Sequence, residues 1–260
     1  MEYITSRQNK RISELKKLIE KTSHRKQKEL SVSSGVKLFS ELSNSGIEIK
    51  EIYLTEKIER LLGEALMPYS DKITVISEDI ANYVSDQKTP EGIFCVFKRP
   101  VMKTIPEGKK FILLDGLQDI GNIGTIIRTA DAFSMDGVIL SEDSADIFSP
   151  KGLRASMGSV LRVNISQMDI NDCIKLLKEK GVSVFASVLS ENREDSLENI
   201  DFPEYSAVII GNEGNGISKE AIDLADRKLT IPMSGGAESL NAAVAAGIIC
   251  FKLGRGYGRH

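Results

Sequence analysis

The chain has 260 residues, of which 41% are hydrophobic and 27% charged, and its formal net charge at pH 7 is −3. This composition excludes a disordered or collagen-like chain and allows one large or two ordinary globular domains. Cys95, Cys173 and Cys250 are far apart and form no CxxC pair. They therefore argue against a disulfide framework or a zinc site and fit a reducing compartment.

The start of the chain has no apolar leader segment, and no apolar run approaches the length of a membrane span. We therefore expect a cytoplasmic protein with no membrane partner.

Positive charge is concentrated at the two ends. Residues 1–30 contain nine Lys or Arg and four Glu, and the last nine residues contain Lys252, Arg255 and Arg259. Such clusters are either a solvated helix face and a frayed tail or patches that contact phosphates. Charge alone leaves both interpretations open.

The first hundred residues predict a small domain. An amphipathic helix is expected over residues 12–27 and a second helix over 33–46, ending at Gly46. Strand-like apolar runs follow, separated by helical stretches such as 57–66; they cover residues 49–55, 72–77 and 92–98.

Two prolines and several lysines between residues 98 and 110 indicate a linker. The predicted organisation is a domain over 1–100, a linker over 101–108 and a second domain over 109–260.

From Phe111 onwards, apolar strands alternate with helices, which predicts an α/β domain with a mostly parallel sheet covered on both faces. The expected strands are 111–115, 137–140, 182–188, 206–211 and 228–232. The expected helices are 122–133, 171–180, a segment after 217–220, and 239–253.

In an open parallel sheet, ligands bind beyond the carboxyl ends of the strands, and three loops there carry unusual residues. The first follows Asp115 and leads into a helix that carries Arg128, with Asn122 predicted as its N-cap. The planar guanidinium of Arg128 suits a phosphate. The alternative interpretation is that Arg128 is a surface arginine on an amphipathic helix.

The second loop is the run Gly-Asn-Glu-Gly-Asn-Gly over residues 211–216. Its glycines allow a close approach of backbone to ligand or a positive φ. The spacing differs from the dinucleotide-binding fingerprint, and no P-loop Gly-Lys-Ser/Thr occurs. Glu213 is the single carboxylate among the glycines.

The third loop follows the expected strand 228–232 and runs through Ser-Gly-Gly-Ala to Glu238-Ser239-Leu240-Asn241. A helix rich in alanine begins there, and Ser239 is predicted to cap it. Core packing explains the alanines but not Ser239 and Asn241 beside a glycine-rich loop.

These three loops resemble motifs 1, 2 and 3 of the SpoU/TrmH family of RNA 2′-O-ribose methyltransferases, in order. The matching patterns are Asn122-x-Gly124-x-x-x-Arg128, Gly211-Asn-Glu213-Gly-x-Gly216 and Ile231-Pro-Met233-x-Gly235-x-x-Glu-Ser239-Leu240-Asn241. The resemblance covers residues 111–254. More loosely, the first domain resembles the N-terminal RNA-binding substrate domain of rRNA methyltransferase-like members.

The resemblance implies a SPOUT-type fold, in which the C-terminal parallel sheet contains a deep trefoil knot, and a smaller, ribosomal-protein-like N-terminal α/β domain. It implies a homodimer formed through the C-terminal domain, with two chains building each active site. It also implies that S-adenosyl-L-methionine is held largely by backbone atoms of these loops. The implied cofactor-binding residues are Gly211, Gly216, Ile231, Met233 and Leu240.

By the same resemblance the catalytic residues are Arg128, Asn122, Glu213, Ser239 and Asn241. A guanidinium with a pKa above about 12 is a poor base near neutrality. We therefore expect Arg128 to anchor a phosphate and stabilise the developing alkoxide, with Glu213 orienting it. Whether the proton leaves through a substrate phosphate or through water stays open.

Two departures from the family pattern stand out. Motif 3 often continues Asn-Val-Ser-Val, whereas this chain has Asn241-Ala242-Ala243-Val244, and the first domain has Ser34-Gly35 where members often have Glu-Gly. The expected substrate is structured RNA, with ribosomal RNA favoured over tRNA. The alternatives are a catalytically silent RNA-binding protein, a phosphate-binding α/β enzyme, and a methyltransferase acting on small molecules or proteins.

Overall fold

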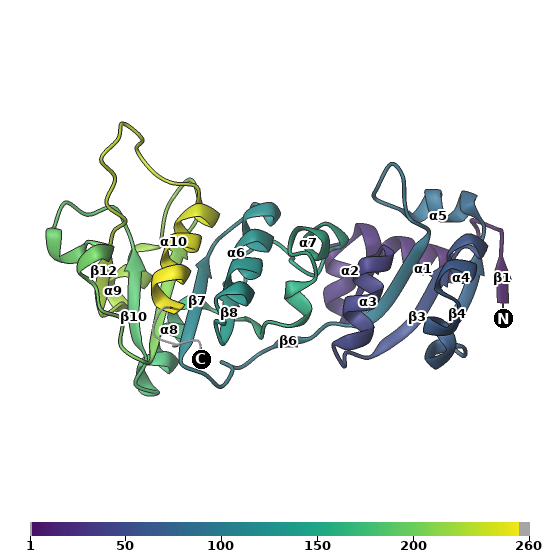
Figure 1. Cartoon of the computed structure of the whole chain (residues 1–260), viewed down its shortest axis with the longest axis horizontal. Coiled ribbons are helices and arrows are strands. Elements are labelled where there is room, and N and C mark those ends of the chain that lie inside the picture. Colours follow the sequence, from purple (N-terminus) through teal and green to yellow (C-terminus); the bar gives the residue numbers. More distant parts are fainter. Residues whose placement is uncertain (1, 255–260) are drawn as a thin grey trace. The chain divides into compact units, whose positions relative to one another are not determined.

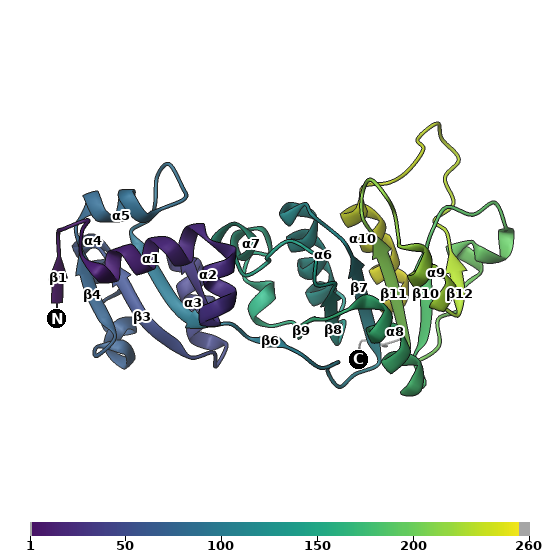
Figure 2. The same ribbon diagram turned by 180° about the vertical axis from the view of Figure 1, so that it is seen from behind.

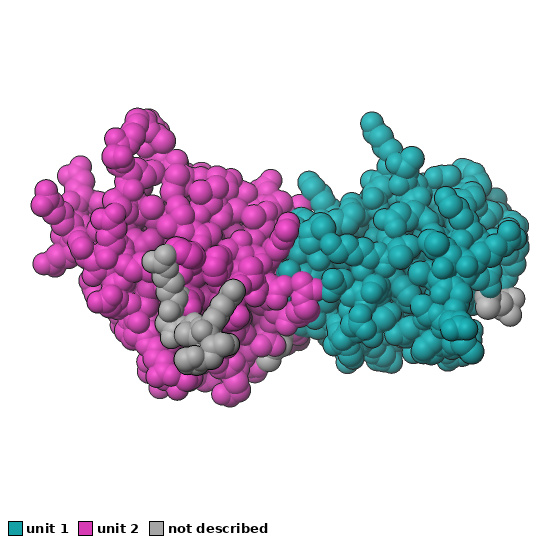
Figure 3. Space-filling view, viewed as in Figure 1, with its two compact units in different colours: residues 1–100, 146–161 teal, residues 101–145, 162–260 magenta. Residues whose placement is uncertain are grey.

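A computed structural model describes residues 2–254, except for the side chain of Met102; Arg255 and Arg259 of the basic C-terminal segment lie outside the described residues. The chain divides into two compact units (Figure 3). Unit 1 comprises the first hundred residues and Asp146–Leu161, and unit 2 comprises Val101–Ala145 and the chain from Arg162 onwards.

Unit 1 contains a five-stranded sheet in the order β1-β4-β3-β5-β2 (Figure 1). The strands β1, β4 and β3 pair in parallel, whereas β5 pairs antiparallel with both β3 and β2. The strand bounds are β1 Glu2–Ile4, β2 Leu30–Ser34, β3 Ile49–Leu54, β4 Ile73–Ile76 and β5 Ile93–Lys98.

The first predicted helix is in fact two helices. Helix α1 (Lys10–Glu20) and helix α2 (Thr22–Lys28) meet at Lys21, whose extended backbone (φ −112°, ψ 110°) interrupts the helix. Helix α1 buries Ile12, Leu15, Leu18 and Ile19, the predicted apolar stripe. The other helices of the first hundred residues are α3 Val36–Asn44, α4 Glu56–Leu62, the 3-10 helix η1 Gly63–Tyr69 and α5 Glu78–Val84.

The segment Asp146–Leu161 packs with unit 1, although the predicted boundaries place it in the second domain. It carries α7 (Pro150–Ala155) and the 3-10 helix η2 (Ser159–Leu161). Its contacts include the Ser31 hydroxyl of β2, which donates to the carbonyl of Phe148. Because Ser31 and Ser33 are buried polar residues, β2 has no apolar pattern and was not predicted.

Unit 2 contains a seven-stranded sheet in the order β12-β10-β11-β7-β8-β9-β6, and every strand pair is parallel. The predicted parallel α/β sheet is therefore confirmed. The strand bounds are β6 Val101–Met102, β7 Lys110–Asp115, β8 Gly137–Leu140, β9 Ile165–Gln167, β10 Ser183–Ser187, β11 Ser206–Gly211 and β12 Arg227–Leu229.

Helices cover both faces of this sheet, as Figures 1 and 2 show from opposite sides. On one face, Phe111 and Leu113 of β7 join a core with Cys173 and Leu177 of α8. Alternation along β7 directs Ile112 and Leu114 to the other face. The helices and 3-10 helices are α6 Ile120–Ala132, α8 Ile170–Glu179, η3 Arg193–Asp195, η4 Leu197–Asn199, α9 Lys219–Leu224 and α10 Ala242–Gly254.

The predicted linker is tied to this sheet: Val101 and Met102 pair with Ile165 and Ser166, and Ile105 is buried in the core. In the described part of the chain, no helix is both long and apolar enough to cross a membrane.

Candidate active site

A cavity of about 530 Å³ lies in unit 2 at the carboxyl ends of its strands. Its lining comes from the segments that follow β10, β11 and β12 and from the start of α10. All five predicted cofactor-binding residues line it: Gly211, Gly216, Ile231, Met233 and Leu240. So do Glu213 and Ser239, two of the predicted catalytic residues.

The first loop positions Asn122 differently from the prediction. The N-cap of α6 is Asp119, whose Oδ1 accepts from the backbone N–H of Asn122 at 2.7 Å. Asn122 is therefore not the cap but lies in the first turn of the helix. Because it is not needed as a cap, its side chain is available to other loops.

A chain of hydrogen bonds joins the three loops. The Asn122 Nδ2 donates to Glu213 Oε1 at 2.7 Å, and the Asn241 Nδ2 donates to Asn122 Oδ1 at 3.1 Å. An ionised carboxylate only accepts hydrogen bonds, so Glu213 fixes which end of the Asn122 amide faces it. That orientation leaves Oδ1 for Asn241.

Asn241 has a second role, as the N-cap of α10. Its Oδ1 accepts from the backbone N–H groups of Ala243 at 2.9 Å and Val244 at 3.3 Å. The prediction that Ser239 caps this helix is wrong, because α10 begins only at Ala242. Ser239 lies exposed at the cavity instead.

The second loop folds back on itself and is held to the end of β7. Asn212 and Gly216 exchange two backbone hydrogen bonds, and the Asn212 Nδ2 donates to the carbonyl of Gly116 at 2.7 Å. A Cβ on Gly211 would lie 2.3 Å from Gly216 C and Ile217 N. Glycine is therefore required at 211 for this close backbone approach.

The loop after β10 also lines the cavity, through Ser187, Val188 and Leu189. The strand is predicted from its apolar sequence, but no ligand role is predicted for its end. Val188 and Leu189 are apolar and the segment has no glycine, so the pattern that marked the motif loops is missing there.

Arg128 lies exposed on α6, about two turns from the start of the helix. Within residues 2–254 its side chain forms no hydrogen bond or ion pair, and the partner of Glu213 is Asn122 rather than Arg128. The expected orientation of Arg128 by Glu213 is thus not part of this arrangement.

Two cations of the basic ends have internal partners. Lys252 donates to the carbonyl of Leu197 and, at 3.0 Å, to that of Glu198. Arg25 is buried and paired with Asp146. Neither is available to a phosphate in this structure.

The cysteines lie in the core away from these loops. Burial raises the pKa of each of the thiols of Cys95, Cys173 and Cys250 to about 12. A nucleophilic thiolate is therefore not part of the chemistry near neutral pH.

A mainly aliphatic and glycine-lined cavity with convergent polar groups, beyond the carboxyl ends of parallel strands, is the ligand site of an α/β enzyme. The sequence matches the SpoU rRNA Methylase family over residues 109–251 and the MRM3-like substrate binding domain over residues 9–95. The chain belongs to the SpoU rRNA Methylase family, as its motifs predicted.

Similar proteins extend the match to the whole chain. The 23S rRNA (guanosine(2553)-2′-O)-methyltransferase RlmP of Bacillus subtilis is 33% identical, over 97% of this chain and 99% of its own. A 23S rRNA (uridine(2479)-2′-O)-methyltransferase of Streptomyces viridochromogenes is 29% identical, over 70% of this chain and 67% of its own. The crystal structure of an AdoMet-bound rRNA methyltransferase from Sinorhizobium meliloti has a TM-score of 0.87 and 28% identity, covering 99% of both chains.

Proposed function

We propose that the protein transfers the methyl group of S-adenosyl-L-methionine to a ribose 2′-hydroxyl of ribosomal RNA. The observation that carries this proposal is a cavity lined by the second and third motif loops, to which the first loop is joined through Asn122, hydrogen-bonded to both Glu213 and Asn241. Family membership and the 23S rRNA 2′-O-methyltransferases among the relatives support it.

The cavity fits an adenosine-containing cofactor. Its volume of about 530 Å³ lies within the range of small-molecule sites, and Ile231, Met233 and Leu240 offer apolar walls for an adenine ring. Gly211 and Gly216 bring backbone N–H and C=O groups close to the cavity without side chains between. We assign these five residues to cofactor binding.

S-adenosyl-L-methionine supplies an electrophilic methyl group, so the protein's task is to align a ribose hydroxyl and assist loss of its proton. Arg128 is permanently charged and exposed, and it anchors a substrate phosphate and stabilises the developing alkoxide. Asn122 fixes the position of Glu213 and is itself held by Asn241, and Ser239 adds a hydroxyl at the cavity.

Assembly belongs to the same proposal. Helix α10 leaves Val244, Ile248 and Phe251 between 38% and 52% exposed, and a second copy of unit 2 would cover such an apolar face. Together with this homodimer we propose the trefoil knot of the family and a cytoplasmic location, where ribosomal RNA would be the substrate. Residues 1–100 serve as the RNA-binding substrate domain, and residues 109–260 as the methyltransferase domain.

The test is to incubate the protein with S-adenosyl-L-methionine carrying a labelled methyl group and ribosomal subunits from a strain lacking the gene. We expect label in ribosomal RNA at one ribose, mapped by resistance of the adjacent linkage to alkaline cleavage. Label in tRNA alone, in a base, or in protein would overturn the proposal.

A further inference from the structure

We propose that Lys10, Lys17, Lys21, Lys26 and Lys28 form a surface that binds the phosphate backbone of double-helical RNA. We call these five residues the α1–α2 lysine surface. The inference rests on the proposed function, because it assumes that the substrate is a folded RNA, and it assigns to unit 1 a specific site and mode of contact.

All five lysines are exposed, and within residues 2–254 none of their side chains forms a hydrogen bond or an ion pair. The other four cations of the first thirty residues are occupied. Arg7 pairs with Asp79 and Arg11 with Glu2, while Lys16 pairs with Glu20 and Arg25 with Asp146; the last of these pairs is buried. The cations of the first thirty residues are thus of two kinds: four bind carboxylates of this chain, and five are available to bind phosphate.

The carboxylates of the two helices do not neutralise the surface. Glu14 lies 2.6 Å from the ring nitrogen of His24, and Glu20 lies 3.8 Å from Lys16. Glu29, just after α2, is the one carboxylate of residues 2–30 without such a partner. Five lysines against a single uncommitted carboxylate make a local positive surface on a chain whose net charge is −3.

Two of the lysines share one face of α1. Lys10 and Lys17 are seven residues apart on α1, so they lie on one face about 10 Å from each other along the axis. Lys21 lies at the junction of the two helices, and Lys26 and Lys28 lie in the last turn of α2. Ile12, Leu15 and Leu18 occupy the buried face of α1, which keeps the charges directed to solvent. Figure 2 shows both helices in purple.

The chemistry of the surface favours a double helix over a single strand. Residues 10–28 contain no Phe, Tyr or Trp, so the helices offer no aromatic platform on which unpaired bases could stack. Lysine is a point charge that contacts phosphate, and phosphate contacts position a protein without reading sequence. Double-stranded RNA is recognised largely through its shape, its phosphates and its 2′-hydroxyls.

The test compares three full-length proteins. The first is unchanged, the second has Gln at all five positions of the α1–α2 lysine surface, and the third has Gln at five other exposed lysines. Gln and Lys have similar helix propensity, so the second variant should fold, as circular dichroism would verify. The control substitutions are at Lys57, Lys88, Lys98, Lys180 and Lys228.

Binding is measured by fluorescence anisotropy with a labelled 20-base-pair RNA duplex and a labelled unstructured 20-nucleotide RNA, over a range of salt concentrations. The surface variant should bind the duplex about tenfold or more weakly near 0.1 M salt, with a salt dependence of log K that is shallower by about 3 to 4. In the control variant, the loss of duplex affinity and the change in salt dependence should each be at most about a third of those in the surface variant.

Equal losses in the two variants would overturn the proposal, since they would report net charge alone. So would a loss confined to the single strand. Binding of S-adenosyl-L-methionine and methyl transfer by the unchanged protein are measured separately. A protein that methylates ribosomal RNA but whose surface variant binds duplex normally would refute this surface and leave the proposed function intact.

Discussion

At the scale of single residues, Asn122 has both ends of its side-chain amide occupied. It donates to Glu213 on one side and accepts from Asn241 on the other. The amide supplies its donor and its acceptor from two separate atoms, one for each neighbour. The three motif loops therefore depend on the chemistry of one side chain rather than on a general polarity of the site.

Replacing Asn122 with Asp should break this chain, because a second carboxylate would face Glu213 and could no longer donate. We expect methyl transfer to fall about 100-fold, as for other small displacements of catalytic groups, with little change in melting temperature. Single-turnover kinetics with ribosomal RNA measure the effect. Thr125→Ala on the exposed side of α6 is the matched control and should retain full activity.

Arg128 has no partner among the described residues to hold it in place, so its removal should cost little stability. We expect Arg128→Ala to abolish detectable methyl transfer while leaving the affinity for S-adenosyl-L-methionine, measured by calorimetry, within about twofold. Near-normal turnover by this variant would show that the phosphate anchor lies elsewhere. Arg128→Lys should recover only part of the activity, because an ammonium lacks the planar fork.

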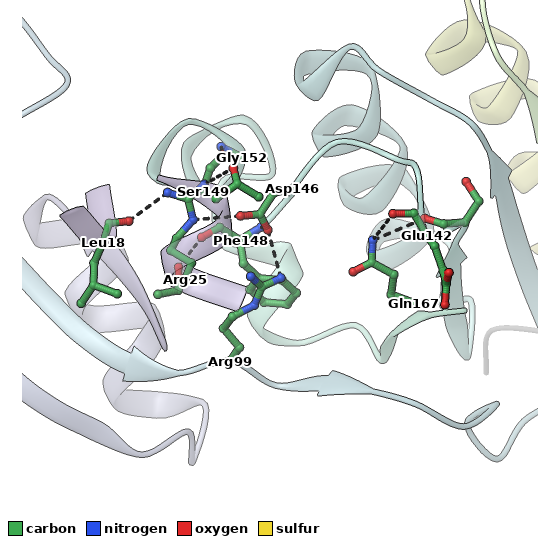
Figure 4. Close-up of polar contacts among 12 residues, drawn as sticks. Leu18, Arg25, Arg99, Glu142, Asp146, Phe148, Ser149, Gly152 and Gln167 are labelled. Atoms are coloured by element: carbon green, nitrogen blue, oxygen red, sulfur yellow. Dashed lines mark hydrogen bonds and ion pairs between the residues drawn. The ribbon is translucent and has the colours of Figure 1, made fainter. Parts of the chain in front are cut away.

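At the scale of elements, a buried cluster of ion pairs joins segments that are distant in the sequence. Asp146 accepts from Arg25 Nε at 2.8 Å and from Arg99 Nη2 at 3.0 Å, and all three side chains are at least 93% buried (Figure 4). Arg25 also donates to the carbonyls of Leu18 and Ile19 at the end of α1. These contacts hold α2, the end of β5 and the segment before α7 in one unit.

Asp146→Ala should therefore leave two buried guanidinium groups without their carboxylate. We expect the free energy of unfolding to fall by about 3–5 kcal/mol, measured from the urea midpoint by circular dichroism. The control is Asp86→Ala, which removes the partly exposed ion pair with Arg154 and should cost about 0–1 kcal/mol. Similar losses for the two variants would mean that the buried cluster is not what secures the segment.

At the scale of the whole molecule, the apolar face of α10 bears on assembly. Val244 and Ile248 are 52% and 38% exposed, and the same helix is capped by Asn241 of the site. A homodimer formed through this face would bring the partner subunit close to the catalytic loops. Dimerisation and activity would then be coupled.

The double substitution Val244→Glu and Ile248→Glu should convert a dimer into a monomer, seen as a halved mass in sedimentation equilibrium, because it buries like charges in the interface. Methyl transfer should fall with dimer content. Leu176→Glu, at an exposed apolar position on α8, is the control and should leave the mass unchanged. A monomeric unmodified protein would contradict the proposed assembly directly.

Much of unit 2 could be predicted from the sequence because its signals are local. Strands such as Ile112–Leu114 are continuous apolar runs, since a parallel sheet covered on both faces buries every side chain. The glycine-rich turn at 211–216 and the three motifs can likewise be recognised from short, continuous stretches of the sequence. The family and two of the loops that line the cavity could be predicted from these signals.

Only the tertiary structure shows the features that depend on contacts between residues distant in the sequence. Sequence could not assign the N-caps, because Asp119, Asn122, Ser239 and Asn241 are all competent caps and only the start of each helix chooses among them. It could not tell that Arg25 is structural whereas Lys17 is exposed, or that Asp146–Leu161 packs with the first hundred residues. The physical reason is that hydrophobic periodicity reports burial within one element, whereas a buried ion pair or a shared amide depends on which segments the fold brings into contact.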